Sequence, residues 1–205
     1  MKYSIILMLL VLLPGVALPN VPCDESWAEF AFTGPEPVSL LVIPDGSGDV
    51  FTNASIVGAR VDATILLHVR DCGYMPIENY PREDLWLESA DNGLAMCYDG
   101  TIADANTDHN GDTTWTQPLF AGGQSEALCL VIVNGAAVTN TAGFNLHFNS
   151  PDIDGNRVVN LTDIPLFAQD FHGGQYRYRS DIYYDGVINL SDVVIMGQAR
   201  GRGCP

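Results

Sequence analysis

The chain has 205 residues, of which 25 are acidic and 9 are basic, so its formal net charge is −16 at pH 7. This charge repels nucleic-acid phosphates and anionic lipid head groups, and the composition therefore excludes nucleic acid as a partner. The same charge is compatible with an extracellular protein that carries bound cations.

The N-terminal segment has the pattern of a secretory signal peptide. Lys2 precedes the apolar run IILMLLVLL, and Pro14 and the small residues up to Ala17 follow it. A positive start, a short apolar core and a small-residue cleavage site are the parts of such a signal. We expect residues 1–17 to be removed and the protein to be secreted to the extracellular space or the cell surface. The run is too short for a membrane span, and no second long apolar segment follows.

Five cysteines follow the predicted signal, and in an exported protein most of them are expected to form disulfides. We expect the pairs Cys72–Cys97 and Cys23–Cys129, with Cys204 left unpaired, although spacing alone does not fix the connectivity. None of the cysteines has the C-x-x-C spacing of a zinc site.

Residues 18–149 have the period-two pattern of β-strands. Residues 143–149 alternate, and residues 127–135 are an apolar run typical of a central strand. Turn signals such as PDGSGD, ADNG, HNGD and AGG separate these segments, and no helical stretch is evident. The pattern predicts an antiparallel β-sandwich. In the segment at 59–70, the residues expected to face inward are Val61, Ala63, Ile65, Leu67 and Val69.

Two stretches of this region resemble bacterial immunoglobulin-like domains. They are VDATILLHVRDCGYMPIENY at residues 61–80 and TDHNGDTTW at residues 107–115. The resemblance implies a spacer or adhesive role. Residues 104–112 also alternate oxygen-bearing side chains in the manner of a calcium loop, but a polar hairpin turning at Asn110-Gly111 is the favoured interpretation.

The C-terminal region repeats one acidic segment. DIDGNRVVNLTD at residues 152–163 and DIYYDGVINLSD at residues 181–192 share positions 1, 2, 7, 9, 10 and 12. A 12-residue calcium loop presents oxygen ligands from positions 1, 3, 5, 7, 9 and 12. The predicted ligands are Asp152, Asp154, Asn156, the Val158 carbonyl, Asn160 through water and Asp163, and then Asp181, Tyr183, Asp185, the Val187 carbonyl, Asn189 and Asp192.

Each loop is followed by an apolar pattern with helical spacing, which begins at the closing aspartate. The spacing predicts inward-facing side chains in both helices. They are Ile164, Phe167, Ala168 and Phe171 after the first loop, and Val193, Met196 and Gly197 after the second.

Aspartate at position 12, asparagine at position 9 and a tandem copy together resemble a type I dockerin over residues 150–205. The resemblance implies two Ca²⁺ ions, two loop-helix units and a cohesin-like β-sandwich partner. The contact residues it implies are Leu161, Thr162, Leu190 and Ser191.

Two residues depart from the calcium-loop pattern. Arg157 replaces the usual glycine at position 6, where a left-handed backbone costs an ordinary residue about 1 kcal/mol. Tyr183 replaces a carboxylate or amide at position 3 of the second loop. We expect both loops to bind calcium through three carboxylates each, and the second loop to bind more weakly.

No catalytic motif is present, so we expect a non-enzymatic protein with a β-sandwich and a small α-helical calcium-binding domain. The leading hypothesis is a structural or adhesive protein. In one version of this hypothesis the protein self-assembles, because the dockerin-like unit of one copy binds the β-sandwich of the next copy. The alternatives are a module that binds a cohesin scaffold, and a carbohydrate-binding sandwich that exposes Trp86 and Trp115. Only Ser150-Pro151 joins the two regions, so we expect them to be docked on each other.

Overall fold

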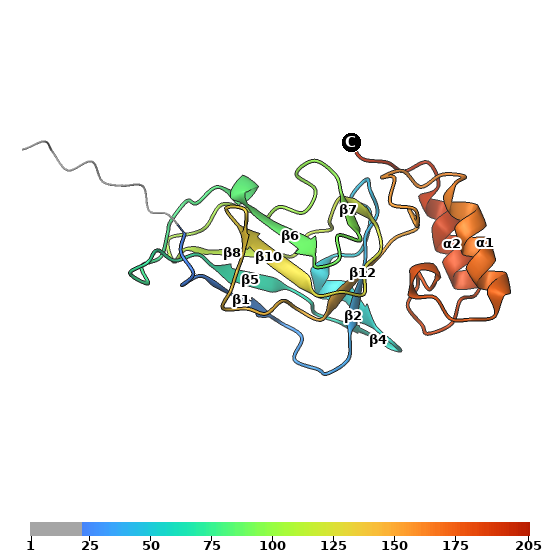
Figure 1. Cartoon of the computed structure of the whole chain (residues 1–205), viewed down its shortest axis with the longest axis horizontal. Helices are drawn as coiled ribbons and strands as arrows, with labels where there is room; N and C mark the ends of the chain where they lie inside the picture. The colour runs from blue at the N-terminus through green and yellow to red at the C-terminus, as the bar shows by residue number, and fades with distance from the viewer. Residues whose placement is uncertain (1–21) are drawn as a thin grey trace, which may run out of the picture.

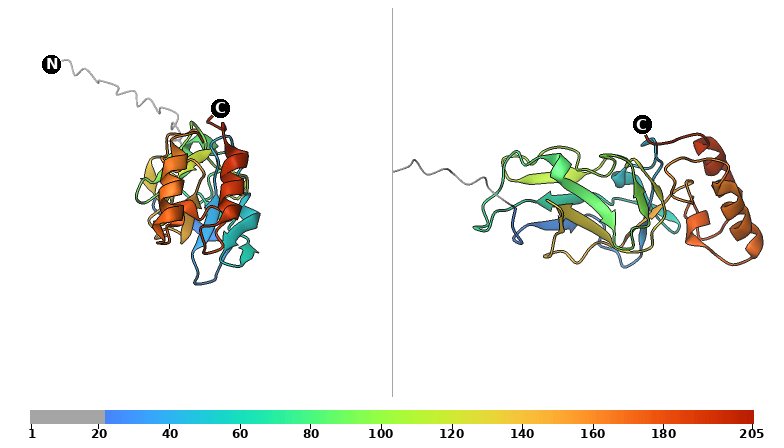
Figure 2. Two further views of the ribbon diagram at one scale, coloured as in Figure 1. Left: turned by 90° about the vertical axis from the view of Figure 1, so that its right-hand side faces the viewer. Right: turned by 45° about the horizontal axis from the view of Figure 1, so that its top comes forward.

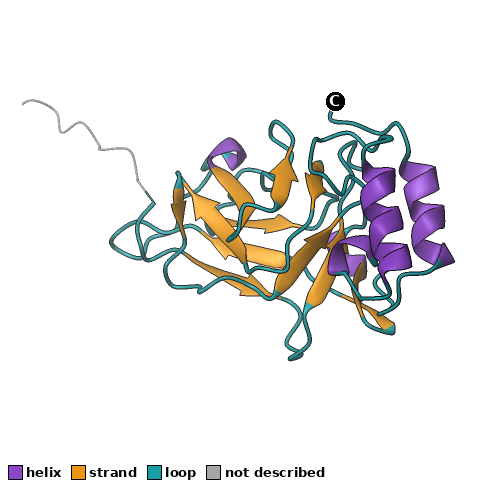
Figure 3. Ribbon diagram, turned by 45° about the vertical axis from the view of Figure 1, so that its right-hand side comes forward, coloured by secondary structure: helices purple, strands orange, loops and turns teal. Residues whose placement is uncertain are grey.

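The computed structural model describes residues 22–205, and the predicted signal peptide, residues 1–17, lies outside the described residues. The described chain is mainly β, with two α-helices near its C-terminal end. All of its strands lie in residues 22–149, which we call the β body. Both α-helices lie in residues 150–205, which we call the C-terminal unit, and this unit lies at one end of the β body (Figures 1 and 3).

The strands of the β body are short, as expected from the frequent turn signals in its sequence. In chain order they are β1 (Trp27–Phe30), β2 (Val38–Leu41), β3 (Ala54–Ile56), β4 (Ala59–Val61), β5 (Ile65–His68), β6 (Leu85–Ser89), β7 (Leu94–Met96), β8 (Asp112–Trp115), β9 (Ala121–Gly123), β10 (Cys129–Val133), β11 (Ala136–Ala137) and β12 (Leu146–Asn149). Single 3-10 turns occur at Phe51–Asn53 and Arg82–Asp84, and in the C-terminal unit at Tyr178–Ser180.

These strands form four small sheets, with the orders β1-β5-β8, β11-β10-β6, β12-β2-β3-β4 and β7-β9. All strand pairs are antiparallel except β2 with β12, which are parallel. The predicted central strand is confirmed, because β10 lies between β11 and β6. The segment AGG, interpreted above as a turn, is instead the strand β9, which pairs with β7.

The core of the β body follows the predicted alternation. Ile65 and Leu67 of β5 and Val69 just after it are fully buried, and so are Leu146 and Phe148 in β12. The same alternation predicts that Asp62, Thr64, His68 and Arg70 face outward, and this was wrong at His68, which is only 9% exposed. Trp27 covers this imidazole, with the two ring centroids 4.5 Å apart.

The C-terminal unit contains α1 (Asp163–Gly173) and α2 (Leu190–Ala199), which lie side by side (Figure 2). As predicted, α1 begins at the closing aspartate of the first loop, whereas α2 begins two residues before Asp192. The prediction of the inward face is half confirmed, because Phe167 and Met196 are buried. The other large members of the predicted stripes are at least 40% exposed, namely Ile164, Phe171 and Val193.

The two regions share their apolar packing, as the short linker predicts. Leu41 of β2 packs against the cluster of the C-terminal unit that contains Phe167 and Met196. Ile43, which follows β2, packs with Val159 and Ala199. One continuous apolar contact therefore joins the β body to both helical segments.

Buried hydrogen bonds reinforce this junction. The Asn149 side chain donates to the carbonyl oxygens of Tyr178 and Asp181 at 2.7 and 2.9 Å. The Tyr178 hydroxyl is 2.8 Å from the Ser39 hydroxyl of β2. Because these polar groups are buried, separating the two regions would leave them unsatisfied and cost free energy.

The disulfide pairs differ from both predicted pairs. The bonds are Cys23–Cys72 and Cys97–Cys204, and Cys129 is the free cysteine. Cys129 lies in the fully buried face of β10, and burial raises the pKa of its thiol, so it is chemically inert. Cys204 reaches Cys97 because the C-terminal tail returns to the first loop, where the Cys204 N–H donates to the Arg157 carbonyl at 3.2 Å.

Candidate metal centre

The first loop is organised around the two aspartates at its ends. The Asp152 carboxylate accepts hydrogen bonds from the backbone N–H groups of Asn156 and Arg157, at 3.1 and 2.8 Å. The Asp163 carboxylate accepts from those of Asp154 and Asn160, at 3.1 and 2.8 Å. The carboxylate at position 1 thus binds positions 5 and 6, and the carboxylate at position 12 binds positions 3 and 9.

The second loop repeats this hydrogen-bond pattern. Asp181 accepts from the N–H groups of Asp185 and Gly186 at 3.1 and 2.9 Å. Asp192 accepts from those of Tyr183 and Asn189 at 2.8 and 2.7 Å. The sequence repeat is therefore also a structural repeat, in which two carboxylates fix the backbone of each loop.

The four aspartates that close the loops are completely buried. Asp152, Asp163, Asp181 and Asp192 are each 0% exposed, and burial raises the pKa of all four, that of Asp152 to about 6. Within residues 22–205, none of the ion pairs to arginine or histidine involves them. A buried carboxylate without a counter-charge costs several kcal/mol. The loops therefore hold negative charge that a bound cation would neutralise.

The two loops differ in how many carboxylates converge. Ligand oxygens of Asp152, Asp154 and Asp163 all lie within 4.8 Å of one another, and this is the only such acidic group in the described part of the chain. In the second loop, the phenol of Tyr183 stands at position 3 and is 48% exposed. The expected set of three converging carboxylates is therefore found in the first loop only.

A tyrosine that the sequence analysis missed contacts the second loop. The Tyr176 hydroxyl donates to the Asp181 carboxylate at 2.9 Å. Position 3 of the second loop is Tyr183 and supplies no carboxylate. The Asp181 oxygen accepts this hydrogen bond from Tyr176 instead. Nothing in the repeat pattern indicates this residue, because it precedes the loop.

The asparagine side chains predicted as ligands form hydrogen bonds within their own loops. The Asn160 and Asn189 side chains donate to the carbonyl oxygens of Val158 and Val187, at 3.0 and 3.2 Å. The Asn156 side chain donates to Asp154 at 3.0 Å.

The strand β9 of the β body packs against the first loop. The Gly123 N–H in β9 donates to the Asp152 carbonyl at 2.9 Å. A methyl group added to Gly122 would lie 1.8 Å from the Asp152 carboxylate oxygen, so only glycine leaves room for that side chain. The first loop is thus completed by a strand that lies far from it in sequence.

Arg157 has the left-handed backbone expected at position 6, with φ of 71°. We predict that Arg157→Gly stabilises the first loop by about 1 kcal/mol, because glycine adopts this conformation without strain. Calorimetric calcium titration should show equal or tighter binding at the first loop, and thermal unfolding in calcium should shift upward. A lower melting temperature would show that the arginine side chain contributes more than its backbone costs.

The implied partner-contact residues lie on the outside of the unit. Leu161 and Leu190, at position 10 of each loop, are 69% and 72% exposed. Thr162 is exposed, whereas Ser191 is only partly exposed. Two large apolar side chains at equivalent positions are therefore available for contact.

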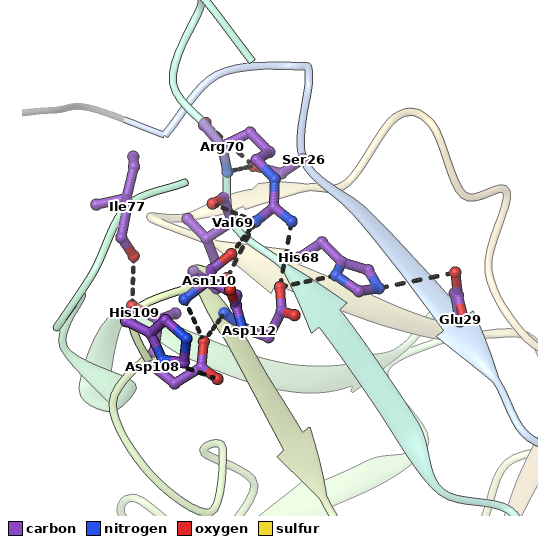
Figure 4. A network of polar contacts seen from close by, with 12 residues as sticks. Ser26, Glu29, His68, Val69, Arg70, Ile77, Asp108, His109, Asn110 and Asp112 are labelled. Atoms are coloured by element: carbon purple, nitrogen blue, oxygen red, sulfur yellow. Dashed lines mark hydrogen bonds and ion pairs between the residues drawn. The ribbon is translucent and has the colours of Figure 1, made fainter. Parts of the chain in front are cut away.

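A second polar network lies in the β body, on β1, β5 and β8 (Figure 4). The His68 Nδ1 atom is 2.8 Å from an oxygen of Asp112, and the Nε2 atom is 3.7 Å from Glu29. Arg70 is 3.2 Å from the same Asp112 oxygen and lies over the ring of Trp27. These polar contacts join β1, β5 and β8.

The turn at residues 108–111 is observed, but it does not join two strands. The Gly111 N–H donates to the Asp108 carbonyl at 2.8 Å, and the Asp108 carboxylate accepts from the Asn110 and Asp112 N–H groups. Its strand β8 pairs with β5 instead of with a neighbouring hairpin strand.

Comparisons of the chain with protein-family models, with curated proteins and with solved structures find no match. Within residues 22–205, no helix combines the length and the apolar character that crossing a membrane requires.

Proposed function

We propose that this is a secreted, non-catalytic calcium-binding protein with a structural or adhesive role at the cell surface or in the extracellular matrix. The observation that carries the proposal is the set of four buried aspartates, placed equivalently in two 12-residue loops, that form no ion pair with any residue of 22–205. Calcium is the preferred ion because it accepts oxygen ligands in flexible geometry, whereas magnesium requires a nearly ideal octahedron.

The rest of the fold supports a structural role. The mainly antiparallel sheets around one apolar cluster support an immunoglobulin-like sandwich, and the two loop-helix units support a dockerin-like domain. The contacts at Ser39, Asn149 and Tyr178 would make the two domains one rigid body. Bound calcium would then make the C-terminal unit rigid, and this unit lies at one end of the β body.

The test is calorimetric titration of the purified protein with calcium, with Asp152→Asn and Asp181→Asn as matched variants. These two residues occupy position 1 of the two loops, so each variant should lose one site and keep the other. The wild-type protein is expected to bind two ions, and more tightly at the first loop. A titration without calcium uptake would overturn the proposal.

The exposed leucines favour a second candidate function, binding of a β-sandwich partner. Leu161 and Leu190 occupy equivalent positions, and such a partner could be a cohesin-like protein or another copy of this chain. Sedimentation velocity in millimolar calcium and in chelator distinguishes these two partners. Large calcium-dependent species would indicate self-assembly, whereas a monomer in both conditions would contradict it.

A further inference from the structure

A cavity of about 380 Å³ lies where the β body meets the first loop. Its lining includes Glu83 and Trp86, Tyr98 and Asp99 from the turn after β7, and Arg157 from the first loop. The volume is within the range of small-ligand sites, and the lining combines aromatic rings with charged groups. None of these side chains is a predicted calcium ligand.

The turn that presents Tyr98 is rigid. Cys97 is bonded to Cys204, its N–H donates to the Phe120 carbonyl at 3.0 Å, and the Phe120 N–H donates to the Gly100 carbonyl at 2.8 Å. Tyr98 is nevertheless 92% exposed, and Asp99 has a left-handed backbone with φ of 53°. The turn therefore presents a large aromatic ring to solvent, and a ligand can cover this ring without rearrangement of the backbone.

Glu83 is paired with the neighbouring Arg82 at 3.5 Å, but the other two charged groups at the cavity are not. Among the described residues, the side chains of Asp99 and Arg157 take part in no ion pair. Both residues have the left-handed backbone, which costs free energy in a residue other than glycine. At Arg157 this backbone follows from position 6 of the calcium loop, so it does not depend on a ligand in the cavity.

We propose that this cavity binds a neutral oligosaccharide. The C–H face of a pyranose ring packs on an aromatic side chain, which Trp86 and Tyr98 provide. Sugar hydroxyls donate to carboxylates and accept from a guanidinium, which Glu83, Asp99 and Arg157 provide. Two carboxylates against one guanidinium disfavour phosphates and acidic sugars.

The expectation that a sugar-binding sandwich exposes both Trp86 and Trp115 is wrong for Trp115. Trp115 is fully buried, and Trp27 is covered by His68 and Arg70. Trp86 is partly exposed and is the tryptophan that lines the cavity. The inference does not depend on calcium binding, although Arg157 belongs to the first calcium loop.

The test is an array of neutral and uronic-acid oligosaccharides probed with the purified protein in calcium, followed by calorimetry with the strongest neutral oligosaccharide. We expect neutral binding that Tyr98→Ala weakens about 10-fold, because a stacked ring contributes about 1 kcal/mol or more. Tyr74→Ala is the matched control, since Tyr74 is 68% exposed but does not line the cavity, and it should bind as the wild type does.

Arg157→Gly separates this proposal from the calcium proposal, because the two expected effects are opposite. It should weaken oligosaccharide binding while relieving strain in the first calcium loop. Absence of binding on the array, binding of acidic sugars alone, or equal affinities of the Tyr98 and Tyr74 variants would each overturn the sugar site. None of these results would bear on the calcium titration.

Discussion

Removal of calcium is expected to lower the free energy of unfolding by about 4 kcal/mol for each tightly bound ion. This value applies to a site whose dissociation constant is about 1,000-fold below the free calcium concentration. Without the cation, buried aspartates such as Asp152 and Asp163 are left without a counter-charge, and their mutual repulsion opposes folding. Each such site should raise the melting temperature by roughly 8–16 °C. The measurement is thermal unfolding, non-reducing, in millimolar calcium and in chelator.

The matched control is the double variant Asp152→Asn/Asp181→Asn, which lacks the position-1 carboxylate in both loops. Its melting temperature should be the same in calcium and in chelator, because little calcium-dependent stabilisation remains. Limited proteolysis gives an independent measurement, and chelation should expose cleavage sites between residues 150 and 180. Equal melting temperatures of the wild-type protein in both conditions would contradict the calcium proposal.

The local features of the C-terminal unit could be predicted from sequence. Because every ligand position of a calcium loop lies within 12 residues, the repeat alone indicates which carboxylates come together at the first loop. The left-handed backbone at Arg157 was also predictable, since position 6 imposes it on any residue. The start of α1 follows from the closing aspartate in the same way.

Contacts between distant segments could not be predicted in this way. The bond between Cys97 and Cys204 depends on the path of the C-terminal tail, which pairs with the first loop through Val158 and Gly203. Cys129 was paired wrongly, although its place in the apolar run 127–135 is typical of a buried residue, and it faces the core. His68 alternates as a surface residue, yet Trp27 of a neighbouring strand covers it.

The exposed half of the predicted helical stripes has a physical explanation. A stripe such as Ile164, Phe167 and Phe171 would be buried if the helix packed on a broad core, but the C-terminal unit offers only a small one. Phe167 fills that core, and its neighbours remain on the surface. The sequence pattern therefore indicates which face is apolar but not how much of it the fold covers, and the uncovered part is available to a partner.

The β body itself should control the first calcium site through Gly122, and Gly122→Ala is expected to abolish that site or weaken it about 100-fold. The added methyl group would lie 1.8 Å from the Asp152 carboxylate oxygen and 2.7 Å from its carboxyl carbon, so this ligand must move out of position.

Calorimetric titration of the Gly122 variant should therefore show a single calcium site, that of the second loop, whose carboxylates lie elsewhere. Retention of this site also shows that the variant is folded. Gly197→Ala in α2 is the matched control, because a methyl group there meets nothing within 4 Å, and two sites should remain. Two sites of wild-type affinity in the Gly122 variant would show that the first loop binds calcium independently of the β body. A single remaining site would show that β9 and the first loop form the calcium site together. It would also explain why β9 has glycines where it lies against Asp152.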